Sequence, residues 1–328
     1  MLLKHMPDNL KGFKIYRRSI RTSFFLVLFL VFVGGIVRST GAGMGCPDWP
    51  KCFGLWVPPL EYADVPLAYW NDPLSSENGK LVFNPIKTWT EYLNRLLGVV
   101  IGFSILIQFI WSFLTKANGK ARFYSTVSFV LVVFQGWLGS KVVSTDLKPL
   151  IITIHLFVAL LIALALLGSL HFSYSAKGQI PGSERVKIPS IVILGFIFLL
   201  VQFFLGTEVR SQVDVLFKKY DYASRNLYTE TLDWKFLVHR SFSLLVFLIL
   251  FFQIFKSGNK LLIEHLKYSF LPLLISIVLI LSGVILAYFD FPEFAQPFHL
   301  FFGFAVVCAQ VWLLLKFPER NVNSNVSG

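Results

Sequence analysis

Long apolar stretches alternate with short polar ones along most of the chain. A helix needs about 20 apolar residues to cross roughly 30 Å of hydrocarbon, and each stretch is close to that length. Pro149 and Pro297 fall in the first turn of two of them, where proline suits a helix N-terminus. The pattern predicts eight membrane-spanning helices, at residues 22–38, 89–114, 123–143, 150–172, 189–209, 236–255, 268–289 and 297–316.

The composition agrees with a chain embedded in lipid. Hydrophobic residues make up 55% of the 328 residues and charged residues only 15%, with a mean hydropathy of +0.66. A soluble domain carries about 25% charged residues. The first apolar run is long enough to span the membrane and no small-residue cleavage pattern follows it, so we expect a permanent anchor rather than a signal peptide.

The basic residues fall unevenly on the two sides of the predicted spans. The N-terminal tail and the loops on its side hold most of the Lys and Arg but few of the acidic residues. Because basic loops stay in the cytoplasm, both termini are expected there. This asymmetry accounts for the net charge of +12, and a basic tail against anionic lipid explains it better than nucleic-acid binding does.

An internal repeat relates the second and sixth predicted spans. TEYLNRLLGVVIGFSILIQFIW resembles KFLVHRSFSLLVFLILFFQIF, which aligns Asn94 with His239 at 145 residues (239 − 94). His155 of the fourth span aligns with His299 of the eighth at 144 residues (299 − 155). Chance similarity between apolar helices is the alternative. The repeat predicts two four-helix bundles that run in the same direction across the membrane.

The predicted fold class is all-α and integral to the membrane, with eight transmembrane helices in two parallel-repeat bundles and both termini cytoplasmic. A charged segment separates the two halves. The expected order is a basic cytoplasmic tail at 1–21, an N-terminal half at 22–172, a cytoplasmic linker at 173–188, a C-terminal half at 189–316 and a cytoplasmic tail at 317–328.

Three histidines lie inside predicted spans, where histidine is rare and usually functional. His155, His239 and His299 stand near the starts of spans that enter from the same side, so they are expected at a similar depth. A satisfied structural hydrogen bond is the alternative for any one of them. A small residue follows each of them, and Asn94, one helical turn deeper. These small residues are Gly98, Ala159, Ser243 and Gly303.

An imidazole above a small residue on two facing helices leaves room for a flat macrocycle. The pattern therefore favours iron porphyrin in the core of a bundle, although ordinary small-residue packing also accounts for Gly98 and its counterparts. Arg95 and Arg240 directly follow Asn94 and His239 and are candidates to pair with porphyrin propionates. Snorkelling of these arginines to lipid headgroups is the competing interpretation.

The segment after the first span reads VRSTGAGMGCPDWPKCFG, and it is followed by EYLNRLLG and by QGWLGSKVV with His155 downstream. Together these segments resemble the signature of the heme A synthase family, from about residue 22 to residue 316. In that family a methyl group of heme O is oxidised to a formyl group, which yields heme A for terminal oxidases. The resemblance implies an oxidoreductase with heme O as its substrate.

The resemblance also implies residue roles. His239 and His299 would ligate heme b in the C-terminal half. His155 would ligate or position heme O in the N-terminal half, and Glu91 would be the catalytic carboxylate near the methyl group. The sequence departs from the family pattern at Asn94, where both the family and the internal repeat place a histidine.

Asparagine is a poor ligand for heme iron, so a heme held by His155 would be five-coordinate or carry water on its Asn94 side. In one interpretation the protein is an active variant, which Glu91 favours because it stands one turn from Asn94. In the other it holds one heme and has a structural or assembly role. Glu91 would then be a negative charge that complements the helix dipole.

Cys46 and Cys52 bracket PDWPK in the first external loop, on the oxidising side of a bacterial-type membrane. We expect a disulfide between them, either as a structural staple or with a redox role.

Two other function classes share some of these features. A membrane b-type cytochrome that relays electrons also places histidines on facing helices, but it needs neither Glu91 nor the cysteine loop. A transporter is suggested only by the repeat. The implied location is the inner (plasma) membrane, with the heme sites toward its outer face. The implied partners are heme O, heme O synthase, terminal oxidase subunits and lipid, and an oligomer is compatible with the sequence.

Overall fold

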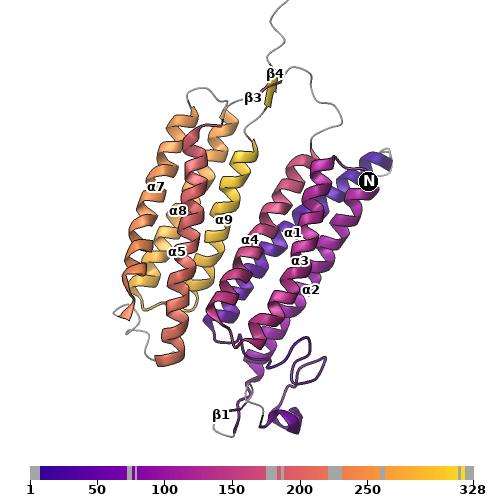
Figure 1. Ribbon diagram of the computed structural model, residues 1–328, viewed down its shortest axis with the longest axis vertical. Coiled ribbons are helices and arrows are strands. Elements are labelled where there is room, and N and C mark those ends of the chain that lie inside the picture. The colour runs from indigo at the N-terminus through magenta and orange to yellow at the C-terminus, as the bar shows by residue number, and fades with distance from the viewer. Residues whose placement is uncertain are drawn as a thin grey trace, which may run out of the picture. The chain divides into compact units, whose positions relative to one another are not determined.

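The computed structural model is dominated by long helices (Figure 1). In its described part, eight helices are long and apolar enough to cross a membrane, and each overlaps one predicted span, so the eight-span prediction is confirmed. The described backbone covers residues 8–71, 76–77, 80–174, 183–185, 188–220, 231–258, 263–316 and 319–321, and the described side chains cover 11–71, 81–174, 188–217, 231–255 and 268–316.

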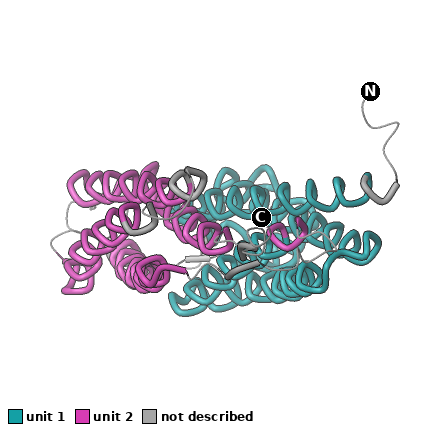
Figure 2. Tube along the Cα trace, turned by 90° about the horizontal axis from the view of Figure 1, so that it is seen from above, with its two compact units in different colours: residues 1–169 teal, residues 170–328 magenta. Residues whose placement is uncertain are grey.

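The chain divides into two compact units, residues 1–169 and residues 170–328 (Figure 2). The division lies in the last turn of the fourth long helix, three residues before the expected end of the N-terminal half at 172 (172 − 169).

The first unit contains four long helices and a structured loop. Helix α1 packs along α2, and α2 packs along α3. Asn84 caps the start of α2 by accepting a hydrogen bond from the backbone N–H of Lys87 at 3.1 Å, and Pro85 takes the first helical position, where its missing N–H costs nothing. The elements are α1 (Asp8–Ser39), η1 (Tyr62–Asp64), η2 (Leu67–Tyr69), β1 (Ser76–Glu77), β2 (Lys80–Leu81), α2 (Pro85–Leu114), α3 (Gly119–Ser144) and α4 (Pro149–Ser173).

The second unit is a ring of four helices. Helix α5 packs against α7, α7 against α8, α8 against α9, and α9 against α5. Strands β3 and β4 form an antiparallel pair beside them in the sequence. The elements are β3 (Ser183–Arg185), α5 (Ser190–Tyr220), α7 (Trp234–Gly258), α8 (Ile263–Tyr288), α9 (Ala295–Lys316) and β4 (Glu319–Asn321).

Two helices are longer than their apolar runs indicate. Helix α1 begins at Asp8, inside the segment expected to be a tail, and α5 continues to Tyr220, beyond the predicted end at 209. Tyr16 and Ile20 on the added part of α1 are fully buried. The helix therefore continues because one face still packs, while its basic residues lie on the other side.

Buried hydrogen bonds join the helices of the first unit. The Tyr16 hydroxyl lies 2.7 Å from the Ser125 hydroxyl and 2.9 Å from that of Ser169. The Gln108 side chain donates to Ser128 at 2.8 Å and accepts from Ser125 at 3.0 Å. Helices in lipid gain little from apolar contact with one another, so such bonds stabilise their association.

The second unit has a smaller buried polar cluster. The Gln310 side chain donates to the Gln253 side chain at 2.7 Å and to the Val192 carbonyl at 2.9 Å. Gln253 follows Gln108 by 145 residues (253 − 108), the spacing that also separates His239 from Asn94. This shared spacing supports the predicted repeat.

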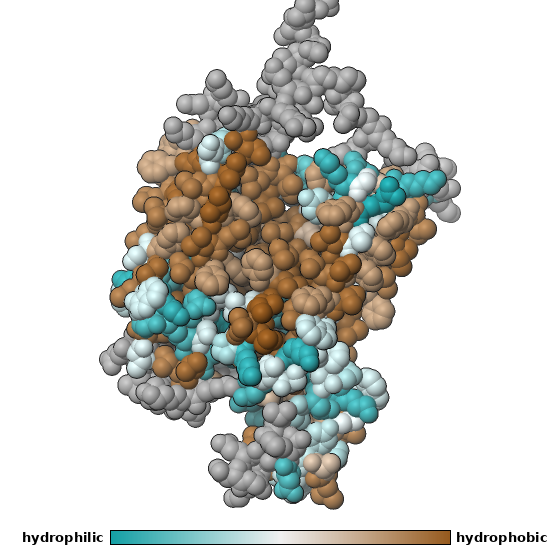
Figure 3. All heavy atoms as spheres, in the orientation of Figure 1, coloured by the Kyte–Doolittle hydropathy of each residue, from teal (hydrophilic) through white to brown (hydrophobic). Residues whose placement is uncertain are grey.

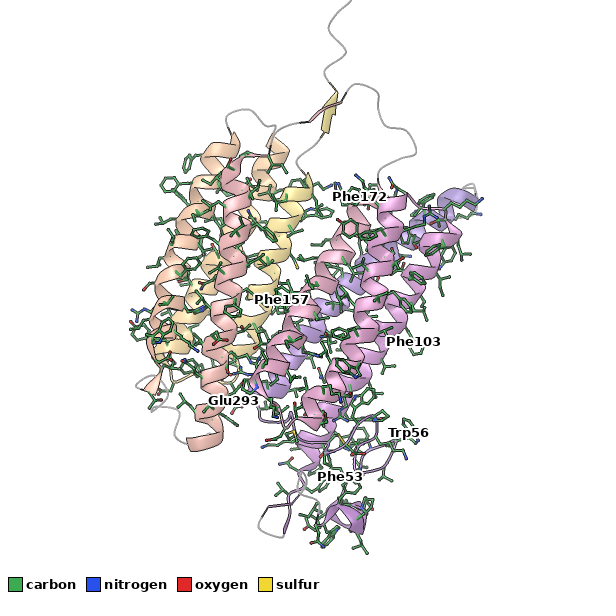
Figure 4. All side chains as sticks on the ribbon, in the orientation of Figure 1. Phe53, Trp56, Phe103, Phe157, Phe172 and Glu293 are labelled. Atoms are coloured by element: carbon green, nitrogen blue, oxygen red, sulfur yellow. A yellow bond between two sulfur atoms is a disulfide. The ribbon has the colours of Figure 1, made fainter. Side chains whose placement is uncertain are left out.

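The sides of the helices are apolar. In the view of Figure 3, hydrophobic residues cover the helices and hydrophilic residues gather toward their ends. Phe103 and Phe157 are 63% and 47% exposed, and Figure 4 marks both among the side chains of the first unit. Large apolar side chains exposed along such helices are suited to lipid contact, as expected of a multi-pass membrane protein.

Candidate functional site

His239 on α7 and His299 on α9 face each other inside the second unit. Their ring centroids are 6.3 Å apart and the ring planes are inclined by 70°. An iron ion held between two imidazoles needs about 2 Å to each ligand nitrogen and about 1 Å from that nitrogen to the ring centre, or about 6 Å in all. The observed separation fits a porphyrin iron ligated on both sides.

Four layer residues, namely Asn94, His155, His239 and His299, each lie near a glycine on the preceding helix. A side chain at any of these glycines would press toward the layer residue. The distances below run from the position that a Cβ would take at the glycine. They are 4.0 Å from Gly34 to Asn94 Oδ1, 3.9 Å from Gly139 to His155 Cε1, 3.2 Å from Gly206 to His239 Cε1 and 3.5 Å from Gly283 to His299 Cε1.

These four glycines follow the repeat but were not predicted as part of the site. Gly206 follows Gly34 by 172 residues (206 − 34), and Gly283 follows Gly139 by 144 (283 − 139). A neighbour on another helix leaves no mark in the periodicity of one helix. The signal that could have found them is the recurrence of glycine at these two spacings.

The space one turn below the layer is open at two of the expected positions. A Cβ placed on Gly98 or Gly303 would meet no other heavy atom of the described structure within 4 Å. Gly98 follows Asn94 and Gly303 follows His299, so one position in each unit has the clearance that a macrocycle requires.

Two glutamines hold the backbone of the layer, and sequence reasoning missed both. Gln135 donates to the His155 carbonyl at 3.0 Å, and Gln202 donates to the His239 carbonyl at 3.1 Å. Each bond joins a layer helix to the helix that precedes it. The ligand positions are therefore fixed by polar contacts as well as by packing.

Asn94 occupies the same kind of glycine-backed position as the histidines. Its Oδ1 atom is buried and has no hydrogen-bond partner in the described structure. A buried amide oxygen without a partner is costly, which is consistent with a ligand at this position.

Glu91 is buried one turn before Asn94 on α2, with 4% of its surface exposed. Its Oε2 atom accepts a hydrogen bond from the Cys46 backbone N–H at 2.9 Å, and its Oε1 atom is ion-paired with Arg95. The carboxylate therefore joins α2 to the loop between α1 and α2. A helix-dipole role alone would not require this buried ion pair.

Arg95 binds the same loop. Its guanidinium donates to the carbonyl oxygens of Asp48 at 2.6 Å, Lys51 at 3.1 Å and Cys46 at 3.1 Å, in addition to Glu91. A porphyrin propionate would have to replace one of these bonds to reach Arg95. The principal contacts of this arginine therefore anchor the loop.

The predicted disulfide between Cys46 and Cys52 is present, with a Cα–Cα distance of 4.8 Å. Both cysteines are fully buried in a cluster with Phe53, Val65 and Leu81. Figure 4 marks Phe53 and the exposed Trp56, which both belong to this loop. The disulfide thus lies in the core of a small folded loop.

Gly45 allows this loop to sit directly on α2. A Cβ at Gly45 would lie 2.5 Å from the Lys87 carbonyl oxygen, a distance that real Cβ contacts do not reach. Thr88 donates to the Gly45 carbonyl at 2.8 Å. Only glycine fits at this close approach of two backbones.

Arg240 has surroundings different from those of Arg95. It is exposed, donates to the Tyr288 hydroxyl at 3.4 Å, and places its guanidinium carbon 5.9 Å from the centre of the Tyr288 ring. A solvent-facing guanidinium of this kind is open to either a propionate or a lipid headgroup.

Charged residues surround the start of α7. The Gln212 side chain and the Lys235 backbone N–H donate to the Asp233 carboxylate, and these bonds hold the pKa of Asp233 below its ordinary value. The Lys235 ammonium also pairs with Glu208 at 2.8 Å. These contacts tie α5 to α7 at the end where His239 lies.

Comparison with known proteins places the chain in a family. Residues 17–311 match the COX15-CtaA model, which describes a cytochrome oxidase assembly protein. The chain belongs to this family. The match covers nearly the whole chain and includes all four layer residues, Glu91 and both cysteines of the disulfide.

Several relatives carry the name heme A synthase. The one from Rhodopseudomonas palustris is 32% identical over 218 residues, which are 62% of this chain and 57% of that relative. The one from Shewanella oneidensis is 29% identical over 42% of this chain and 39% of that relative. The alignment with the Bartonella tribocorum protein covers 98% of this chain and 100% of that relative at 24% identity.

Proposed function

We propose that the protein is a heme A synthase, which oxidises a methyl group of heme O to a formyl group. One observation carries the proposal: His239 and His299 face each other at a separation that fits a ligated porphyrin iron, in a family whose relatives are named heme A synthases. The conversion removes four electrons from the methyl carbon and adds one oxygen atom, so the protein needs a redox centre beside its substrate.

In the C-terminal half, His239 and His299 would hold heme b. This heme supplies a one-electron redox centre when bound. Gln202 fixes the backbone of His239, and Gly206 and Gly283 give the two rings the space to stand in the layer. Arg240 is the exposed cation available to a propionate.

In the N-terminal half, His155 would hold heme O. Asn94 leaves the opposite position without an imidazole, so we propose a five-coordinate iron or one that carries water there. Arg95 stays close to this position through its contacts with Glu91 and the loop.

Glu91 is the proposed catalytic carboxylate. It is buried, and Arg95 and the Cys46 N–H fix both of its oxygens beside the layer. A fixed carboxylate can accept a proton released at the methyl carbon or stabilise positive charge that develops there.

We further propose that the layer lies toward the outer face of the inner membrane and that both termini are cytoplasmic. The distribution of Lys and Arg supports this orientation. Heme O synthase and subunits of the terminal oxidase are the proposed partners, since they would supply the substrate and receive the product.

A heme-binding assembly factor without catalysis is the second candidate. Asn94 favours it, because one of the expected imidazoles is missing. In that case Glu91 and Arg95 would serve only to hold the external loop.

Heme analysis in a bacterium that makes heme O but lacks heme A separates the two candidates. Extracted hemes are chromatographed with and without this gene. Heme A in the expressing strain supports the synthase. Heme b on the purified protein with heme O unconverted, once expression and membrane insertion have been verified, would favour the assembly factor.

A further inference from the structure

Ser282 links His299 to a backbone carbonyl on α8. Its Oγ atom lies 2.8 Å from His299 Nδ1 and donates to the Leu279 carbonyl oxygen at 2.9 Å. A carbonyl oxygen only accepts, so the single hydroxyl hydrogen of Ser282 points toward Leu279. The Ser282 oxygen then accepts the hydrogen of His299 Nδ1.

The direction of this chain determines the tautomer of His299. With its proton on Nδ1, the imidazole has an unprotonated Nε2, which is the nitrogen left to bind a metal. A ligand histidine that donates its other N–H is also held in orientation and becomes a stronger electron donor to the metal.

We propose that Ser282 is a positioning residue that holds His299 in the ligating tautomer and lowers the reduction potential of the heme between His239 and His299. The inference rests on the proposed heme b site. A more basic imidazole stabilises ferric iron more than ferrous iron, so removing the Ser282 acceptor raises the potential.

The contact belongs to one ligand of the pair. His239 Nδ1 is buried and has no hydrogen-bond partner in the described structure, and Gln202 holds its backbone instead. The repeat places Leu138 at the position of Ser282 in the N-terminal half (282 − 144), and leucine offers no acceptor. The two ligands therefore act unequally on the iron.

The test is a redox titration of heme b in the purified full-length protein. In Ser282→Ala we expect the potential to rise, and a tenfold change in the preference for ferric over ferrous iron corresponds to about 59 mV. Ser282→Thr retains a hydroxyl and should keep the wild-type potential. Ser276→Ala is the matched control, because Ser276 is buried on the same helix and donates to the Leu273 carbonyl in the same way.

An unchanged potential in Ser282→Ala, with heme b bound, overturns the inference. If that variant loses its heme, Ser282→Cys replaces the hydroxyl by a weak acceptor of similar size, and its potential must rise for the inference to stand. Absence of heme b from the wild-type protein would instead remove the proposed function itself.

Discussion

Asn94 differs from the other layer residues in chemistry but not in surroundings. Gly34 lies beside it as Gly206 lies beside His239. We expect Asn94→His to fit this space and to supply the missing imidazole. A heme in the N-terminal half should then become six-coordinate and low-spin, which an absorption or electron paramagnetic resonance spectrum detects.

Asn94→Gln is the matched control, because it lengthens the side chain without adding an imidazole. It should keep the high-spin spectrum of the wild type. A spectrum unaffected by histidine, in protein that has heme in both halves, would mean that position 94 does not face the iron.

Gly206 has the tightest clearance of the four glycines. A Cβ there would lie 3.2 Å from His239, so His239 must move in Gly206→Ala. We expect roughly tenfold weaker binding of heme b, as for other changes that displace a metal ligand. Gly283→Ala is the control, because 3.5 Å is an ordinary contact. Equal heme content in both variants would contradict the assigned role of Gly206.

Glu91 lies in the first unit, and the His239–His299 pair lies in the second. Glu91→Ala should therefore leave heme b in place while it lowers heme A formation by about 10²-fold or more. Product and bound heme b are measured in the same preparation. Arg95→Lys is informative beside it, because lysine keeps the charge but cannot make the same set of bonds to the loop. Undiminished heme A formation in Glu91→Ala would end its catalytic role.

The histidines of the layer could be identified from the sequence because polar residues stand out in apolar runs. The surroundings of Arg95 could not, since its partners are carbonyls at positions 46, 48 and 51 and any residue type offers the same carbonyl. Ser282 was missed for a similar reason: a serine in a span is common, and its bond to His299 depends on how α8 meets α9.

Among the elements, α1 shows why helix ends are harder to predict than helix centres. Its apolar run begins near residue 22, yet the helix begins at Asp8. Lys14 and Arg18 are charged and exposed, but they do not interrupt the helix, because Tyr16 and Ile20 on another face are buried. Hydropathy therefore finds the part of a helix that lies in lipid, and packing decides where the helix ends.

The Tyr16 hydroxyl offers a test of how α1 is held to α3 and α4. Tyr16→Phe removes its bonds to Ser125 and Ser169 and should destabilise the protein by about 1 kcal/mol, which thermal unfolding in detergent measures. Tyr268→Phe is the control, because the contact of Tyr268 with Lys316 uses its ring rather than its hydroxyl. Equal melting temperatures for both variants would contradict the proposed stabilisation.

For the whole molecule, the number of spans was predictable because each apolar run matches the membrane thickness. Orientation remains a prediction from the Lys and Arg distribution. We expect a fluorescent protein fused to either terminus to fluoresce and alkaline phosphatase fused there to be inactive, since both termini would be cytoplasmic. Alkaline phosphatase inserted in the loop between α1 and α2 should be active. The opposite pattern would reverse the assigned orientation.

The glycine beside Asn94 has a genetic consequence. Codons for asparagine and histidine differ only in their first base, so one nucleotide change would place an imidazole in a space that Gly34 already keeps open. No second mutation is needed to make room. The chain therefore stands one mutational step from a layer with four histidines, and laboratory selection for heme A production could show whether that step is taken.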